Sequence, residues 1–458
     1  MGMGRRKRQR QEELWIAADA LPRIPRHVFY EKLNGLLAEA GFDDFVEQLC
    51  EPCYAKDGRH SIPPGVYFRM LFVGYFEGID SQRGIAWRCA DSLSLKAFLG
   101  YGLTEKTPDH SSLTNTRQRL PLEIHEAVFA FVLQMAESHR LLSNKTVAVD
   151  STYLEANAAM KSIVRKETGE DWQSYIKRLM QEEGVVSEEE EPSDEEVRRF
   201  DRKRKGKKVS NKEWESTTDP ESRIAKMKDG RTHLAYKAEH VVDLESEFLL
   251  DATVYRADEA DTETLDTSLD RAEAHLESAG ATGEIKKVVA DKGYHANKTL
   301  AACSRRGTSG VKTYIPEPDS PWERRWTDKP PEYKAAVYNN RRRMSRAYGK
   351  ALQRKRSELV ERSFAHICET GGARRTWLRG IEKINKRYKL QAAARNLGLL
   401  MGKLFGIGKP RGMTGARGLV FLARSIVRRL DALRNRPSLP VIRLAALGNR
   451  STPYPLAA

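Results

Sequence analysis

Cysteine is scarce and long apolar runs are missing, and both features narrow the class of protein. The five cysteines are an odd number at scattered spacings, which argues against a disulfide framework and favours reduced thiols: Cys50, Cys53, Cys89, Cys303 and Cys368. Cys50 and Cys53 form one CxxC, but no second pair follows at a spacing typical of zinc sites. No run of about 18 apolar residues occurs, so we expect no membrane span. The basic N-terminus lacks the apolar stretch of a secretory signal, and we expect a cytoplasmic protein.

Acidic side chains are rare towards the C-terminus, where basic ones accumulate. Residues 371–458 contain 19 Lys+Arg and only two acids, Glu382 and Asp431, so this segment carries the whole excess behind the net charge of +16. A second basic run spans residues 341–356. Clustered cations are typical of phosphate contacts, and we expect a nucleic acid as the partner, although a merely basic surface gives the same composition. The basic amphipathic stretch 419–433 is expected to face DNA or to pack, rather than to lie on a membrane.

Residues 1–140 are expected to form an N-terminal helical domain. Two prolines precede a nearly continuous apolar helix at 66–76, and shorter helices start at polar residues such as Ser81 and Asp109. Short helices with arginine on one face indicate either a DNA-binding helix-turn-helix or a plain helical bundle, and both interpretations stay open.

Residues 141–405 are expected to form one α/β domain, followed by a basic helical C-terminal tail at 406–458. Apolar and β-branched runs predict five strands, with one clear helix at 262–278 before the fourth strand. This order is typical of a mixed sheet flanked by helices. The predicted strands lie at 146–150, 233–243, 247–255, 288–291 and 312–315.

A charged insertion at about 165–212 separates the first two of these strands. Residues 182–196 contain nine acids, and residues 198–208 contain eight bases. Opposite charge blocks favour a solvated, mobile segment over a packed core, so we expect neither buried structure nor a metal site there.

Two aspartates stand at the ends of apolar strands. Asp150 closes the first predicted strand, and Asp291 closes the fourth. A carboxylate at the end of a buried strand is costly unless a cation or hydrogen-bond donors neutralise it. Hard cations such as Mg²⁺ and Mn²⁺ prefer carboxylate oxygens, and two such ions serve phosphodiester cleavage well. The pair therefore indicates metal-dependent chemistry on a polyanion.

A third acid is expected on a helix around residues 356–367. Val360, Phe364 and Ile367 give this helix one apolar face that packs on a sheet. Glu361 lies at the edge of that face and is our candidate, and Glu358, one turn earlier, is the alternative.

These motifs, taken together and in this order, resemble the DDE transposases of bacterial insertion sequences. The similarity spans roughly residues 25–405, although each short motif alone is weak. It rests on VAVDST with EANA, TDPESR before YKAEH, VADKGY, LVERSF, WLRG and ARNL, at residues 147–152, 155–158, 218–223, 236–240, 289–294, 359–364, 377–380 and 394–397.

The resemblance implies an RNase H-like catalytic core in which Asp150, Asp291 and Glu361 are the catalytic residues and hold two Mg²⁺ (or Mn²⁺). It implies a transposase that binds the inverted repeats of its element in double-stranded DNA and then cleaves and transfers strands. Because this reaction brings two element ends together, we expect a homodimer, located in the cytoplasm near the bacterial nucleoid. An inactive DNA-binding relative and a nuclease that only hydrolyses are the alternatives.

The surroundings of the third acid depart from the family pattern. Many relatives carry a Tyr, an Arg and a Lys around the glutamate, where this chain has Arg354, Ser357 and Cys368, with an arginine displaced to Arg356.

Trp322 and Trp326 are expected either to pack or to stack on an unpaired base. We expect DNA contacts from six residues: Lys292, Tyr294, Arg354, Arg356, Arg362 and Arg379.

Overall fold

The computed structural model describes residues 27–410, except residues 56, 57, 59, 60, 188–190, 205–209, 228 and 323. Contacts divide the chain between Pro410 and Arg411. The described residues end at Pro410, so the basic segment that follows it, including the predicted amphipathic stretch 419–433, lies outside them.

The N-terminal region is helical, as predicted. Short helices begin where a polar side chain accepts from a backbone N–H, namely at Ser81, Ser92 and Asp109, which satisfies donors that a helix start leaves unpaired. The elements are α1 (Val28–Glu39), α2 (Phe42–Cys50), η1 (Glu51–Cys53), α3 (Pro64–Glu77), α4 (Gln82–Asp91), α5 (Leu93–Phe98), α6 (His110–Arg119) and α7 (Leu122–Ser138).

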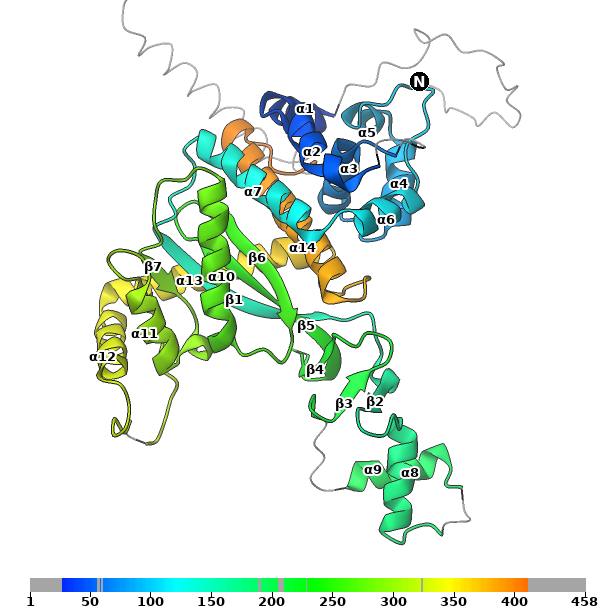
Figure 1. Cartoon of the computed structure of the whole chain (residues 1–458), viewed down its shortest axis with the longest axis vertical. Helices are drawn as coiled ribbons and strands as arrows, with labels where there is room; N and C mark the ends of the chain where they lie inside the picture. Colours follow the sequence, from blue (N-terminus) through cyan, green and yellow to red (C-terminus); the bar gives the residue numbers. More distant parts are fainter. Residues whose placement is uncertain are drawn as a thin grey trace, which may run out of the picture. The chain divides into compact units, whose positions relative to one another are not determined.

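A mixed sheet forms the centre of the second region, and it contains the five predicted strands together with β4, which was not predicted (Figure 1). The strand β1 pairs antiparallel with β5 and parallel with β7. On the outer sides, β5 pairs with β4 and β6, and β7 pairs in parallel with β8. The strands are β1 (Thr146–Glu155), β4 (Arg223–Lys226), β5 (Thr232–Asp243), β6 (Leu249–Arg256), β7 (Lys287–Val289) and β8 (Lys312–Tyr314).

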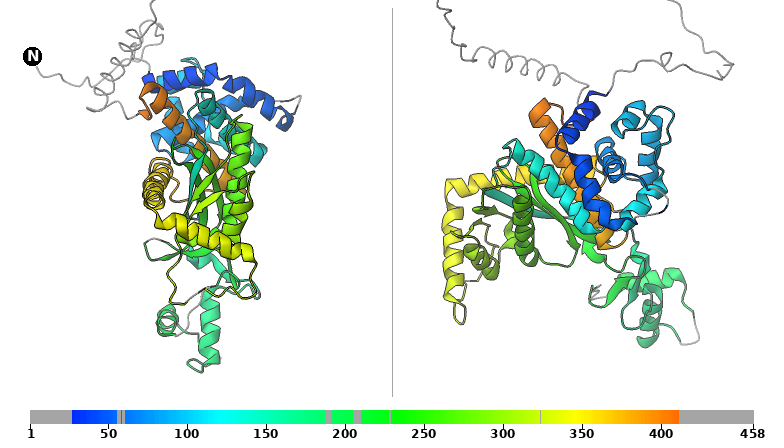
Figure 2. Two further views of the ribbon diagram at one scale, coloured as in Figure 1. Left: turned by 90° about the vertical axis from the view of Figure 1, so that its left-hand side faces the viewer. Right: turned by 45° about the horizontal axis from the view of Figure 1, so that its top comes forward.

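Helices cover both faces of this sheet. Successive strand residues point to opposite faces, and on β5 Glu239 accepts from side chains of α10 (Asp261–Ser278), whereas the next residue, His240, contacts Ser363 of α13 (Ala347–Ala365). The left view of Figure 2 shows α10 and α13 on opposite sides of the sheet. Other elements of this region are η2 (Met160–Ser162), η3 (Lys292–Tyr294), α11 (Asn297–Arg305), α12 (Pro331–Ser345) and η4 (His366–Thr370).

The last described helix, α14 (Ile381–Phe405), joins the helical region to the sheet. It packs against α7, α3 and β6. At its centre, Lys389 is fully buried and forms an ion pair with the equally buried Asp251 of β6. The two predicted domains thus share a continuous apolar core.

The charged insertion contains more structure than we expected. The short strands β2 (Ile163–Arg165) and β3 (Trp214–Ser216) pair with each other, and helices α8 (Trp172–Glu182) and α9 (Asp194–Lys203) lie between them in the sequence. A small apolar cluster stabilises the two helices: Ile176, Met180 and Val197 are all buried. The expectation of a solvated segment without buried structure was therefore wrong, because these three residues fall on facing helix sides.

Candidate active site

Asp150 lies on β1 with its side chain 23% exposed, and it faces α13. One carboxylate oxygen accepts from the backbone N–H of Ser151 at 2.9 Å, and the other accepts from the Arg356 guanidinium at 2.6 Å. Burial raises the pKa of Asp150, and the nearby Asp291 carboxylate adds to the rise, whereas Arg356 opposes it. A hydrogen-bond donor, the Ser151 N–H, and a cation, Arg356, therefore both stabilise the charge at this strand end, as expected from the sequence.

Asp291 reaches the same edge of the sheet. It follows β7, which runs parallel to β1 with Val289 opposite Ala148, so each aspartate comes two residues after this pair. Its carboxylate accepts from the backbone N–H of Gly293 at 2.8 Å and caps the short helix η3. The structure therefore brings the two sequence-predicted aspartates together.

Glu361 does not form a metal-binding group with Asp150 and Asp291 in the structure. It is exposed on α13, next to the fully buried Val360. The alternative acid, Glu358, is also exposed and forms an ion pair with Arg362. Within the part of the chain that the structure describes, no group of three or more His, Cys, Asp or Glu side chains is arranged to hold a metal ion. The aspartate pair suits a hard divalent cation by its donor atoms, and the third ligand is not assembled.

The guanidinium of Arg356 is the cation that lies beside Asp150. Its side chain is 12% exposed and lies between α13 and the sheet. Gln353, one turn earlier, accepts from the Arg356 Nε at 3.2 Å and donates to the carbonyls of Ala290 and Tyr314. The helix is thus anchored on β7 and β8, and the displaced arginine of the sequence motif is aimed at the first aspartate.

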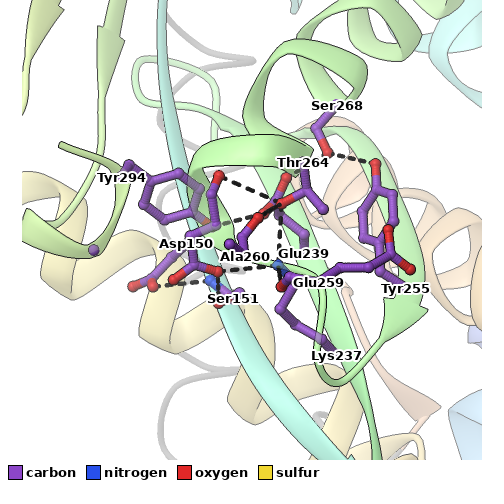
Figure 3. A network of polar contacts seen from close by, with 12 residues as sticks. Asp150, Ser151, Lys237, Glu239, Tyr255, Glu259, Ala260, Thr264, Ser268 and Tyr294 are labelled. Atoms are coloured by element: carbon purple, nitrogen blue, oxygen red, sulfur yellow. Dashed lines mark hydrogen bonds and ion pairs between the residues drawn. The ribbon is translucent and has the colours of Figure 1, made fainter. Parts of the chain in front are cut away.

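A second polar network lies on the opposite face of β1 (Figure 3). The Ser151 hydroxyl donates to Asp261 at 3.0 Å, and the buried Lys237 ammonium also donates to Asp261 at 3.1 Å. Glu239 accepts from the Tyr294 hydroxyl and from Thr264, both at 2.8 Å. This network fixes Ser151, which follows Asp150, and Tyr294, three residues after Asp291.

Glu239 is the charged centre of this network and was missed in the sequence. It is fully buried, and burial raises its pKa to about 7 against the opposing hydrogen bonds from Ser268, Tyr294 and Thr264. The available signal was the alternation of Lys237 and Glu239 along a strand-like run, which places two charges on one face of a sheet.

The six residues predicted to contact DNA fall into different environments. Lys292 and Arg354 are exposed. Arg362 is exposed but pairs with Glu247 and Glu358, and Arg379 is exposed while its Nε donates to the carbonyl of Asn157 at 3.2 Å.

The other two, Tyr294 and Arg356, point inwards. Tyr294 has no exposed side-chain surface because its ring is buried below η3 and its hydroxyl donates to Glu239. A DNA contact from Tyr294 does not fit this arrangement, and the residue instead anchors the turn after Asp291. Arg356 is committed to Asp150. Of the two tryptophans, Trp322 is exposed, whereas Trp326 packs partly against the core.

A mixed α/β domain with paired aspartates at one sheet edge, preceded by a helical region, is consistent with an RNase H-like catalytic domain. Two family models match the chain: residues 18–119 match a transposase domain (DUF772), and residues 210–397 match a transposase DDE domain. No curated protein and no solved structure matches. The chain therefore belongs to the DDE transposases of insertion sequences, as its motifs predicted. Among the described residues, no helix is long and apolar enough to cross a membrane.

Proposed function

We propose that this transposase binds the terminal inverted repeats of an insertion sequence, cleaves DNA at the element ends and joins the exposed 3′ hydroxyl to target DNA. The observation that carries the proposal is the pairing of β1 with β7, which supports Asp150 and Asp291 as neighbouring catalytic carboxylates. When bound, two Mg²⁺ or Mn²⁺ ions supply activation of the attacking oxygen and stabilisation of the leaving oxygen.

The protein's own contribution is to hold the two aspartates in fixed orientations. Backbone donors at Ser151 and Gly293 each orient one carboxylate, so little reorganisation is left for the reaction. We propose Glu361 as the third ligand because it lies on the helix whose Arg356 already contacts Asp150. Glu358 is the less suitable alternative because Arg362 neutralises it.

We further propose that the protein acts on double-stranded DNA as a homodimer near the bacterial nucleoid, because strand transfer involves two element ends. Lys292, Arg354, Arg362 and Arg379 are the proposed phosphate contacts, which position DNA without reading its sequence. The helices of residues 28–138 are the proposed readers of the inverted repeats.

Single substitutions at the acids test the proposal. On linear DNA that carries the repeats flanking the gene, Asp150→Asn, Asp291→Asn and Glu361→Gln should each abolish cleavage while repeat binding without metal persists. Glu358→Gln is the matched control, an exposed acid one turn earlier on α13, and should cleave like the unaltered protein. Joining of a labelled 3′ end to a second DNA separates a transposase from a nuclease. Cleavage that survives all three substitutions would refute the site.

A further inference from the structure

The loop that joins η4 to α14 lies beside the strand of Asp150 and contains an exposed tryptophan among arginines. We propose that this loop, residues 372–380 and hereafter the Trp377 loop, binds the DNA duplex close to the cleaved phosphate, with Trp377 as a stacking platform. The inference rests on the proposed function and names a contact surface for it.

Backbone hydrogen bonds attach the Trp377 loop to the end of β1. The Glu155 N–H donates to the Arg374 carbonyl at 3.0 Å, and the Thr376 N–H donates to the Glu155 carbonyl at 2.8 Å. Glu155 follows Asp150 on the same strand, at a separation of about 17 Å if each residue advances by about 3.3 Å. That length equals about five nucleotides of one DNA strand, so a duplex that has a phosphate at Asp150 and runs along β1 reaches the loop.

Three exposed arginines give the loop its charge: Arg374, Arg375 and Arg379. Arg374 pairs with Glu369, and Arg375 lies 3.9 Å from a carboxylate oxygen of Glu155. Ion pairs between exposed groups contribute only about 0–1 kcal/mol. A phosphate therefore competes readily for these guanidinium groups, which also offer forked donors suited to it.

Trp377 is held in place although its side chain is 48% exposed. Its indole N–H donates to Asp80 at 2.7 Å, and the Arg375 guanidinium lies 5.3 Å from its ring centroid. The Asn157 amide fixes the Trp377 carbonyl at 3.1 Å. An aromatic ring that is both exposed and oriented is prepared to stack on a base that has left the duplex, and stacking of one such unpaired base contributes about 1–3 kcal/mol.

Asp80 also connects the loop with the helical region. It stands between α3 and α4, and Gly372 of the loop packs beside its side chain. On α4, which follows, Arg83 and Trp87 are exposed as well. The loop therefore contacts both the end of β1, five residues beyond Asp150, and the helical region proposed to read the repeats.

The test compares loop variants with matched controls in the full-length protein. The variants are Trp377→Ala, Trp377→Phe and the double variant Arg375→Ala/Arg379→Ala. The controls are Tyr348→Ala and Arg305→Ala. Tyr348 is 50% exposed and bonded to Lys287 at the opposite end of β7, and Arg305 is 61% exposed on α11. Binding to a duplex of the flanking inverted repeat is measured without divalent metal over a range of salt concentrations.

We expect Trp377→Ala to weaken binding about tenfold, as loss of one stacked base predicts, and Trp377→Phe to restore most of it. The double arginine variant should lower the slope of log affinity against log salt by about 2, because each lost phosphate contact removes about 0.9. Hydroxyl-radical footprints should lose protection only within about five nucleotides of the cut. Thermal unfolding checks that each variant folds. If the Trp377→Ala protein does not fold, DNA binding by the Trp377→Phe and Arg375→Ala/Arg379→Ala proteins tests the proposal instead.

The outcomes separate this inference from the proposed function. If the unaltered protein binds and cleaves the repeat while all loop variants behave like Tyr348→Ala and Arg305→Ala, the Trp377 loop is not a DNA surface. If the unaltered protein does not bind the repeat duplex, both proposals fall. Binding that depends on the loop, together with cleavage that survives Asp150→Asn, would support the surface and refute the catalytic site.

Discussion

Replacing Arg356 with glutamine removes the cation that neutralises Asp150. We expect the Arg356→Gln protein to be less stable without divalent metal and to bind Mn²⁺ more tightly. In the structure the guanidinium is 2.6 Å from the carboxylate, and the two side chains are 12% and 23% exposed. The guanidinium and a divalent cation are therefore alternative partners for the same carboxylate.

The exposure of the pair sets the size of the stability change. Exposed ion pairs contribute about 0–1 kcal/mol, and removal of one partner from a buried pair costs about 3–5 kcal/mol. An intermediate value of about 2 kcal/mol follows for this partly buried pair. Because burial holds the pKa of Asp150 above its ordinary value, its protonation favours the folded state at low pH, and this contribution is lost as the pH rises through the folded-state pKa. The difference between the two proteins should therefore grow with pH.

The gain in metal affinity follows from the removed repulsion. A divalent cation and a unit charge about 6 Å apart repel each other by about 6 kcal/mol at an effective dielectric constant of 20. About a quarter of this energy, which remains after screening by salt and after retreat of the side chain, corresponds to about a tenfold change in affinity.

Mn²⁺ titration followed by electron paramagnetic resonance measures the affinity, and urea unfolding at several pH values measures stability. Arg354→Gln is the matched control because Arg354 is an exposed arginine on the same helix. Equal Mn²⁺ affinity and equal stability in Arg356→Gln and Arg354→Gln would refute the reasoning.

Two further predictions concern buried charges. Since the pKa of Glu239 is raised to about 7, its contribution to stability is present at low pH and lost as the pH rises, by about 3 kcal/mol between pH 4 and 8. Glu239→Gln should remove this pH dependence in urea unfolding, and an unchanged profile would contradict the assignment. Lys389→Met leaves Asp251 buried without its cation and should cost about 3–5 kcal/mol. Lys389→Met/Asp251→Asn should recover much of that loss, and failure to recover it would argue against the ion pair as the cause.

The sheet could be predicted from the sequence because its signals are local. Apolar runs ending in a polar residue mark β1 and β7, and the parallel pairing of the two strands then places Asp150 and Asp291 at one edge. The structure of the insertion was mispredicted because a count of its charged residues takes no account of the spacing of its few apolar residues. Ile176 and Met180 lie one helical turn apart among charged neighbours, and this spacing is what packs α8 against Val197.

The roles of individual side chains were harder to predict because they depend on partners distant in the sequence. A tyrosine three residues after the candidate aspartate Asp291 is compatible with a DNA contact until Glu239, on another strand, is found to accept from its hydroxyl. Helical periodicity placed Glu361 at the edge of an apolar face, but the period fixes only the relative angles of residues on α13. The rotation of the helix on the sheet is set by tertiary contacts such as those of Gln353.

The exposed position of Glu361 is compatible with the charge balance at the edge of the sheet. The Asp291 carboxylate adds to the rise in the pKa of Asp150, and Arg356 lies beside only one of the two acids. A third carboxylate about 4 Å from either aspartate adds about 4 kcal/mol of repulsion at an effective dielectric constant of 20. As the proposed third ligand, Glu361 would join the aspartates only together with added positive charge. The helix α13 carries both Arg356, which contacts Asp150, and the exposed Glu361. Assembly of the proposed site would therefore depend on this helix.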